Sequence, residues 1–388
     1  MTQARFLHAA DLHLGSPLKS LGDAIGEPER KRFEQLVNKA FDRLVQTAID
    51  EQVDFVLLAG DVYDSADRDP GAQRRFLLGL RRLTETGIRV FMVHGNHDPL
   101  TRDIKNGLLP EGVVVFPAGK LGVETVKMRN GAEVTVAGVS YSKTHEEQNF
   151  VPLFAGLSGR TIVGVLHTNV GGNTQHGNYA PCSVSDLEQS PVHYWALGHI
   201  HLRTVKQTPR GWWAYPGNLQ GRSTKAAETG PKGVLIVDVD ESGSISEPRF
   251  VECSTVRFAR IEVGMDEVAE VGGVDDEVGA HLQTLVSESG GVPHLVRLEL
   301  TGQTDITELL DSSKWDPDQT LAEANSVLDG GAIVKLKFSC VPRVDLAEQR
   351  VRGTLLGTVL DELDKEEVAD DIRDAATSLL VRALGAQQ

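Results

Sequence analysis

The feature that most constrains this sequence is a series of short apolar runs in its first 240 residues, each followed directly by polar residues. Near-continuous apolar runs of this length are typical of strands that are covered on both faces of a sheet. Residues 27–52 and 70–87 lie between the first three runs, and their apolar residues recur at a helical spacing. Alternating strands and helices predict a layered α/β domain.

The pattern changes after residue 240 and predicts further parts of the chain. Residues 240–250 are rich in turn-forming residues. Residues 257–340 alternate weakly between strand and helix patterns, which indicates a small α+β domain, and from Val344 to Gln388 the spacing is helical. A chain of 388 residues is too long for one typical core, so we divide it into residues 1–253, 254–342 and 343–388.

Charge and cysteine content indicate which partners and which compartment suit the protein. Residues 241–388 contain 13 Lys and Arg against 29 Asp and Glu, so they carry the whole net charge of −16, and the neutral first 240 residues remain able to bind a polyanion. Cys182, Cys253 and Cys340 lie far apart, which fits a reducing cytoplasm. No apolar run approaches the ~20 residues that cross a bilayer, and no signal peptide is recognisable, so we expect a cytoplasmic protein without membrane contact.

Asp, Asn and His residues follow five of the predicted strands. They are Asp11 with His13, Asp61, Asn96 with His97 and Asp98, His167, and His199 with His201. The carboxyl ends of parallel strands meet at one edge of an α/β sheet, where ligands bind. Residues at positions i and i+2 of an extended chain point to the same side, so Asp11 with His13, and His199 with His201, can each direct two groups to one place.

The chemistry of these side chains indicates bound metal. Carboxylate, imidazole and carboxamide groups without thiolates suit a divalent ion such as manganese, iron or zinc. Seven such ligands exceed what one ion needs, and two ions that share one carboxylate fit better. Two neighbouring metals can hold the attacking hydroxide and the phosphoryl oxygens of an in-line displacement. A single histidine at a strand end is more often structural. Five groups of such residues, each after a predicted strand and in this order, favour a two-metal site.

The motifs DLH (11–13), GDVYD (60–64), GNHD (95–98), His167 and GHIH (198–201) together resemble those of the calcineurin-like metallophosphoesterase superfamily. The stretches FLHAADLHLGSP, YAPC (179–182) and YPGNLQGR (215–222) resemble its DNA repair exonuclease branch, which includes SbcD-type nuclease subunits and YhaO-type proteins. Asn218 stands where many SbcD-type sequences have Ser, which favours the YhaO type. The resemblance implies an α-β-β-α sandwich nuclease domain, then a small α+β capping domain and a helical C-terminal segment.

The resemblance also implies a role for each residue of the motif set. One metal would be held by Asp11, His13 and His201, the other by Asn96, His167 and His199, and Asp61 would bridge them. His97 would face the substrate, where it protonates the leaving alkoxide or stabilises charge in the transition state. Asp98 would orient His97 by a hydrogen bond. For Asp64 a structural role is favoured.

These roles predict a two-metal phosphodiesterase that acts as a DNA exonuclease or endonuclease in DNA repair. Manganese is the metal that the family favours, and iron or zinc also fits the ligands. Candidates for contacts with DNA are Lys19, Arg68, Arg102 and His176. The resemblance leads us to expect an SMC-like coiled-coil ATPase that docks on the C-terminal helices, and homodimerisation is a further expectation of the family.

Two other interpretations of the same residues remain. The substrate could be a small phosphodiester such as a cyclic nucleotide, or the chain could be a scaffold without catalysis. The added capping domain and helical tail argue against a small substrate, and the intact ligand set with His97 argues against a scaffold. Few Lys or Arg occur in residues 254–342, so we expect this domain to shape a groove or contact a protein rather than grip DNA.

Overall fold

The computed structural model describes residues 4–18, 21, 25–64, 69–100, 109–172, 179–270, 272–304, 315–343, 346–354 and 357–361. The chain divides into two compact units. The first extends to Phe258 but leaves out Leu21 and Ile25, which group with the second unit, from Ala259 onward. Over the described ranges, none of the helices combines the length and the apolar character that crossing a membrane requires.

The first unit contains two six-stranded sheets, and the first of them has the strand order β12-β11-β1-β2-β3-β4. Strands β1 to β4 run parallel, β11 pairs antiparallel with β1, and β12 pairs antiparallel with β11. The bounds of these strands are β1 Ala4–Ala9, β2 Phe55–Ala59, β3 Arg89–Val93, β4 Val113–Val115, β11 Gly233–Val239 and β12 Arg249–Glu252. The carboxyl ends of β1, β2 and β3 therefore lie side by side.

The second sheet has the order β5-β6-β7-β8-β10-β9, and its four inner strands are parallel. Strands β5 and β9 form antiparallel edges. The bounds are β5 Gly122–Lys127, β6 Glu133–Val139, β7 Ile162–His167, β8 Tyr194–Gly198, β9 Thr204–Thr208 and β10 Gly211–Tyr215. Strands β7 and β8 each end at or beside a histidine of the predicted site, so this sheet also contributes carboxyl ends to it.

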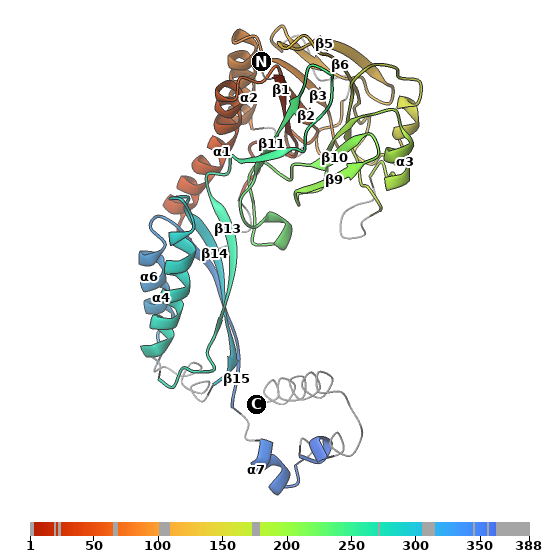
Figure 1. Ribbon diagram of the computed structural model, residues 1–388. Helices are drawn as coiled ribbons and strands as arrows, with labels where there is room; N and C mark the ends of the chain where they lie inside the picture. The colour runs from red at the N-terminus through yellow and green to blue at the C-terminus, as the bar shows by residue number, and fades with distance from the viewer. Residues whose placement is uncertain are drawn as a thin grey trace. The chain divides into compact units, whose positions relative to one another are not determined.

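Apolar side chains pack in three layers around these sheets. Helices α1 (Glu27–Asp50) and α2 (Pro70–Glu85) cover the outer face of the first sheet, where Phe41 and Phe76 pack 5.5 Å apart between ring centroids. A second layer, which includes Phe55, fills the space between the sheets. The helix α3 (Val184–Gln189) and the 3₁₀ helix η3 (Val151–Phe154) cover the second sheet. Figure 1 shows this order of layers, which confirms the predicted α-β-β-α sandwich.

The second unit has one three-stranded sheet in the order β13-β14-β15. Its elements are β13 Arg257–Gly264, α4 Gly272–Ser287, β14 His294–Gln303, α6 Pro317–Val327 and β15 Ala332–Val341. Strands β14 and β15 are parallel, and Val296, Leu298 and Leu300 on β14 belong to the core that includes side chains of α4 and α6. Of the predicted C-terminal helical segment, the structure describes only α7 (Leu346–Val351) and a few residues beyond it.

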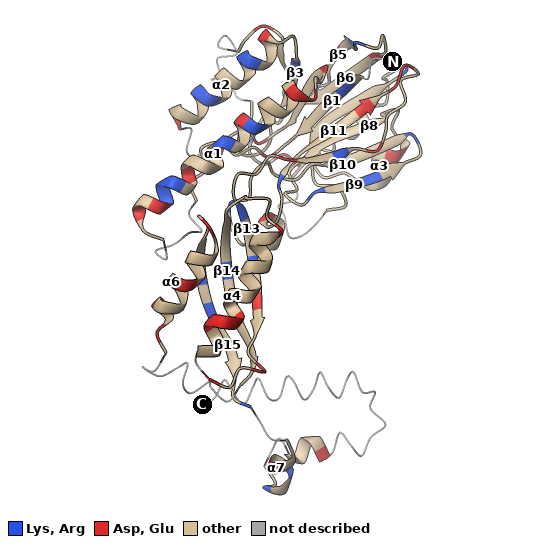
Figure 2. Ribbon diagram, turned by 60° about the vertical axis from the view of Figure 1, so that its left-hand side comes forward, with Lys and Arg blue, Asp and Glu red and all other residues tan. Residues whose placement is uncertain are grey.

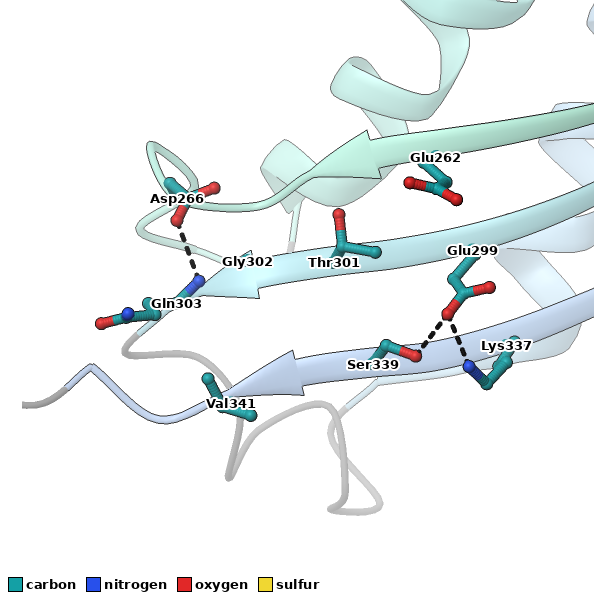
Figure 3. Close-up of a pocket in the computed structure, with 9 residues that line it drawn as sticks. All are labelled: Glu262, Asp266, Glu299, Thr301, Gly302, Gln303, Lys337, Ser339 and Val341. Atoms are coloured by element: carbon teal, nitrogen blue, oxygen red, sulfur yellow. Dashed lines mark hydrogen bonds and ion pairs between the residues drawn. The ribbon is translucent and has the colours of Figure 1, made fainter. Parts of the chain in front are cut away.

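Charge is unevenly distributed in the second unit. Helices α4 and α6 carry Asp and Glu but no Lys or Arg (Figure 2). The sheet carries a pocket of about 620 Å³ lined by polar side chains, among them Glu262, Glu299, Thr301 and Lys337 (Figure 3). Lys337 donates a hydrogen bond to Glu299 in this pocket. Acidic charge therefore predominates on the helices, whereas the sheet pocket carries both signs of charge.

Candidate metal centre

The first group of predicted site residues lies where the pairing of β1 and β2 continues beyond their ends. The Asp11 amide donates to the Gly60 carbonyl oxygen (3.1 Å), and the His13 amide donates to the Asp61 carbonyl oxygen (3.0 Å). Asp11 and His13 are thus fixed beside Asp61 by main-chain hydrogen bonds. Asp11 and Asp61 are buried, with exposed fractions of 1% and 2%, which is costly for a carboxylate without a charge partner.

The backbone at these positions is in the left-handed region. Among the described residues, seven other than glycine have positive φ, and four of them are predicted metal ligands: Asp11 (51°), His13 (42°), Asp61 (52°) and His199 (105°). Such conformations cost free energy and concentrate at functional sites, where the surrounding structure holds them. The segments that follow β1 and β2 remain hydrogen-bonded side by side, and these backbone conformations direct the side chains toward a common point.

Glycines beside the ligands permit their close approach. A Cβ atom on Gly95 would lie 2.3 Å from Asp61 Oδ1 and 2.9 Å from two ring atoms of His167. A Cβ on Gly60 would lie 2.4 Å from His167 Nδ1, and Gly60 also has a φ of 92°. Both positions require glycine because any other side chain would occupy the space of a neighbouring ligand.

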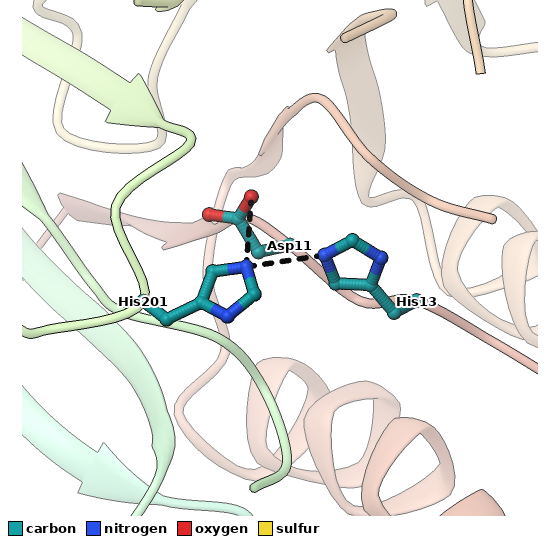
Figure 4. Close-up of side chains that lie close together, drawn as sticks. All are labelled: Asp11, His13 and His201. Carbon is teal, nitrogen blue, oxygen red and sulfur yellow. Dashed lines mark hydrogen bonds and ion pairs between the residues drawn. The ribbon is translucent and has the colours of Figure 1, made fainter. Parts of the chain in front are cut away.

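Asp11, His13 and His201 form the first ligand cluster (Figure 4). His13 Nε2 lies 3.2 Å from His201 Nε2, and His201 Nε2 lies 3.9 Å from Asp11 Oδ1. On the other side of each ring, Nδ1 is held by a carboxylate: His13 by Asp64 (2.7 Å) and His201 by Glu228 (2.7 Å).

This geometry fits a cation. An Nδ1 that donates to a carboxylate carries the proton, so the Nε2 of the neutral ring has a lone pair. Burial lowers the pKa of His13, which favours the neutral ring. The two Nε2 lone pairs of His13 and His201 therefore face each other at 3.2 Å and repel unless a positive ion binds both. The donor set of one carboxylate and two imidazoles suits a divalent transition metal.

A second cluster surrounds Asp61 and His167. His167 Nδ1 donates to the Ala59 carbonyl oxygen (3.0 Å), and its Nε2 lies 3.0 Å from Asn96 Oδ1 and 3.4 Å from Asp61 Oδ2. Burial opposes a charge on His167, but the Asp61 carboxylate outweighs this effect and raises the pKa of His167 to about 9. The same oxygens that favour a proton at this Nε2 would favour a metal ion there.

Asp61 contacts both clusters, and His199 lies beside the second. Asp61 Oδ2 is 3.4 Å from His167 Nε2 and 3.9 Å from His13 Nε2, as a bridging carboxylate would be. The ring centroid of His199 lies 5.2 Å from that of His167, and the His199 amide donates to both oxygens of Asp11 (3.1 and 3.0 Å). All seven predicted ligands thus gather at one edge of the sandwich.

His97 lies next to these clusters, and its partner differs from the prediction. His97 Nδ1 is 3.2 Å from Asp64 Oδ1, and this carboxylate raises the pKa of His97. The predicted hydrogen bond between Asp98 and His97 is wrong, because the Asp98 oxygens accept from the amides of Val62 and Gly95 (2.9 Å each). Asp98 therefore fixes the backbone of the two loops, and Asp64 holds His97.

Two side chains that support the centre are not among the predicted site residues. Glu228, on the 3₁₀ helix η4 (Ala226–Glu228), holds His201 and also accepts from Asn218 Nδ2 (2.7 Å). Arg222 Nη1 donates to the second oxygen of Asp64 (3.2 Å). Glu228 is a lone acidic residue in a polar stretch, and nothing in the local pattern distinguishes it. The predicted substrate contacts Lys19, Arg68, Arg102 and His176 lie outside the described residues.

Comparison with known proteins agrees with this architecture. The calcineurin-like phosphoesterase family matches residues 4–203, and the middle domain of metallophosphoesterase YhaO matches residues 258–340. The chain therefore belongs to the calcineurin-like phosphoesterases, a family of metal-dependent phosphoesterases with a dinuclear metal site.

Individual relatives extend over most of the chain. The uncharacterized metallophosphoesterase YhaO of Bacillus subtilis is 33% identical over 323 residues, which are 83% of this chain and 77% of that protein. The DNA double-strand break repair protein Mre11 of Aeropyrum pernix is 29% identical over 73% of this chain and 68% of its own length. The Mre11 protein of Archaeoglobus fulgidus is 25% identical over 68% of this chain and 62% of its own length.

Proposed function

We propose that this protein is a two-metal phosphodiesterase that cleaves DNA as an exonuclease or endonuclease in DNA repair. The observation that carries the proposal is the pair of ligand clusters joined by Asp61, with His97 beside them. Two relatives that bear the name of DNA double-strand break repair proteins support DNA as the substrate. Manganese is the proposed metal, and the same ligands also fit iron or zinc.

The candidate ligands would hold two metal ions. Asp11, His13 and His201 would hold one ion, Asn96, His167 and His199 the other, and Asp61 both. When bound, the ions supply a nucleophile at neutral pH and neutralise charge on the phosphoryl group. The fixed carboxylates and carbonyl behind the imidazoles keep their Nε2 atoms oriented, so that little reorganisation is needed.

His97 is the proposed proton donor to the leaving oxygen. Its side chain is 44% exposed, and its Nδ1 is engaged by Asp64, which leaves Nε2 for the substrate. The raised pKa of His97, caused first by the hydrogen bond to Asp64, keeps the ring protonated over a wider pH range. A general acid of this kind contributes roughly 10²- to 10⁴-fold to the rate.

The test is cleavage of end-labelled duplex and single-stranded DNA with Mn²⁺ by the wild type, H97A and H281A. We expect H97A to lose roughly 10²- to 10⁴-fold in kcat, since the leaving oxygen lacks its proton donor. H281A is the matched control, because His281 is similarly exposed (41%) but lies on α4 of the second unit. The same proteins would be assayed on a small phosphodiester.

The possible outcomes test the identity of the substrate and the presence of a working metal centre independently. DNA cleavage by the wild type and H281A, with strong loss in H97A, supports the nuclease, and product lengths give its polarity. Cleavage of the small diester alone would show that the metal centre is correct and DNA is not the substrate of the isolated chain. Absence of both activities in the metal-loaded wild type would contradict the proposal.

The proposed partner is an SMC-like coiled-coil ATPase that docks on the C-terminal helices, and the proposed assembly is a homodimer. The described part of that segment offers one supporting observation: Val351, in α7, has 88% of its surface exposed. Removal of residues 345–388 would abolish association with the ATPase in a pull-down. Unchanged association would refute docking at this segment.

A further inference from the structure

Arg222 lies between two carboxylates that support the candidate metal centre from behind. Its Nη1 donates to Asp64 Oδ2 (3.2 Å) and to Ser16 Oγ (3.2 Å). On its other side, Nη2 lies 3.8 Å from Glu228 Oε1, and the Arg222 amide donates to Glu228 Oε2 (3.0 Å). The Arg222 side chain is 25% exposed, so these contacts are partly shielded from water.

The two carboxylates that Arg222 contacts hold different parts of the centre. Asp64 Oδ1 is shared by His13 Nδ1 (2.7 Å) and His97 Nδ1 (3.2 Å). Glu228 Oε1 accepts from His201 Nδ1 (2.7 Å), and its Oε2 also accepts from Asn218 Nδ2 (2.7 Å). Two imidazoles of the first ligand cluster and the proposed proton donor therefore depend on these two side chains.

We propose that Arg222 is a positioning residue that ties these two carboxylates together and so sets His13, His201 and His97 relative to one another. The inference rests on the proposed function and deepens it. A guanidinium is planar, always charged and carries donors on several edges, so it can hold two carboxylates in a fixed relation. A Lys ammonium is a compact charge on a flexible stem and cannot fix both in the same way.

The charge of Arg222 and its positioning role predict opposite effects of its removal on metal affinity. Arg222 is a cation beside a site for cations, so by charge alone its removal would strengthen metal binding. If Arg222 acts by positioning, its removal lets Asp64 and Glu228 move apart, the imidazoles lose their orientation, and metal binding weakens. Residues that orient metal ligands typically contribute about 10- to 100-fold to affinity.

The experiment measures Mn²⁺ affinity by isothermal titration calorimetry for the wild type, R222A, R222K and R257A. Arg257 is the matched control: it is 17% exposed and forms an ion pair with Glu252, but none of its described contacts is a candidate ligand. We expect R222A and R222K to bind Mn²⁺ roughly 10- to 100-fold more weakly, and R257A to bind as the wild type does. Guanidinium ion at low millimolar concentration should partly restore binding in R222A, whereas equal urea should not.

The results that would overturn the inference are distinct from those that bear on the proposed function. If R222A binds Mn²⁺ as tightly as the wild type or more tightly, Arg222 does not position the ligands. If R222A does not fold, R222K, which keeps the charge and the length, decides the question in the same way. A wild-type chain that binds none of Mn²⁺, Fe²⁺ and Zn²⁺ would refute the proposed function, and the inference with it.

Discussion

At the scale of single residues, the candidate centre depends on what holds each imidazole at Nδ1. His13 is held by Asp64, His201 by Glu228 and His167 by the carbonyl oxygen of Ala59. Each contact places the proton on Nδ1 and leaves Nε2 for a metal. Asp64 has a second task, because it also holds His97.

This shared role of Asp64 leads to a prediction about pH. In D64N the neutral amide no longer favours the charged form of His97, so the pKa of His97 falls. The protonated ring that donates to the leaving oxygen is then lost at a lower pH, and the alkaline limb of the kcat/KM profile moves to lower pH. We also expect kcat to fall roughly tenfold or more, since His13 loses its orienting partner.

The control for this prediction is D98N, measured over the same pH range. Asp98 accepts from the amides of Val62 and Gly95 and not from His97, so this variant should lose stability without a shift of the alkaline limb. A shift in D98N together with an unmoved limb in D64N would restore the role first predicted for Asp98.

The gathering of the candidate ligands could be predicted from sequence, whereas the contacts that hold them in place could not. Asp11, His13 and Asp61 follow apolar runs directly, and parallel strands bring such positions together. The prediction for Asp98 is wrong because adjacency to His97 in the chain does not bring their side chains together, and the Asp98 carboxylate accepts from backbone amides instead. The hydrogen bond between Glu228 and His201 depends on the tertiary fold alone, so no local sequence pattern predicts it.

At the scale of secondary-structure elements, the strand ends shape the centre. Strands β1, β2 and β3 are parallel neighbours, and their carboxyl ends are followed by Asp11, Asp61 and Asn96. The turns that follow have left-handed residues and glycines without which the ligands would collide. The same turns therefore end the strands and position the ligands.

The turn after β3 gives a second prediction. In G95A the new methyl group would meet Asp61 Oδ1 at 2.3 Å and the His167 ring at 2.9 Å, so the bridging carboxylate and a ligand must move. We expect a loss of about 1–3 kcal/mol in the free energy of unfolding and clearly weaker Mn²⁺ binding. Chemical denaturation and calorimetry would measure the two effects.

G156A is the matched control for this variant. A Cβ atom on Gly156 would meet no atom within 4 Å, and this residue is exposed in the same unit. Its stability and Mn²⁺ binding should match those of the wild type. Equal behaviour of G95A and G156A would show that Gly95 does not limit the geometry of Asp61.

The sequence pattern predicts the inner strands of the sandwich better than the edge strands. Strands β2, β7 and β8 are fully buried and read as continuous apolar runs. The edge strands β5 and β9 contain one buried residue and none, so their sequences lack such a run, and β4 is a run of only three valines, none of them buried. They become strands because an inner neighbour offers hydrogen bonds, which is a tertiary effect.

At the scale of the whole molecule, the chain combines a catalytic unit with an acidic second unit. All seven predicted ligands, His97, Asp64, Arg222 and Glu228 belong to the first unit, which has its own cores. The second unit has a separate core, and its helices α4 and α6 carry no Lys or Arg. The candidate phosphate chemistry therefore lies in the first unit, and the charge on α4 and α6 argues against contacts of these helices with phosphate.

The central claim is a dinuclear centre bridged by Asp61, and the most direct measurement is metal content. The wild type and D61N would be dialysed with Mn²⁺, separated from free metal and analysed by inductively coupled plasma mass spectrometry. We predict two ions per chain in the wild type and fewer in D61N, because an amide cannot bridge two cations as a carboxylate does. One ion or none in the wild type, or two ions retained by D61N with unchanged affinity, would contradict the account.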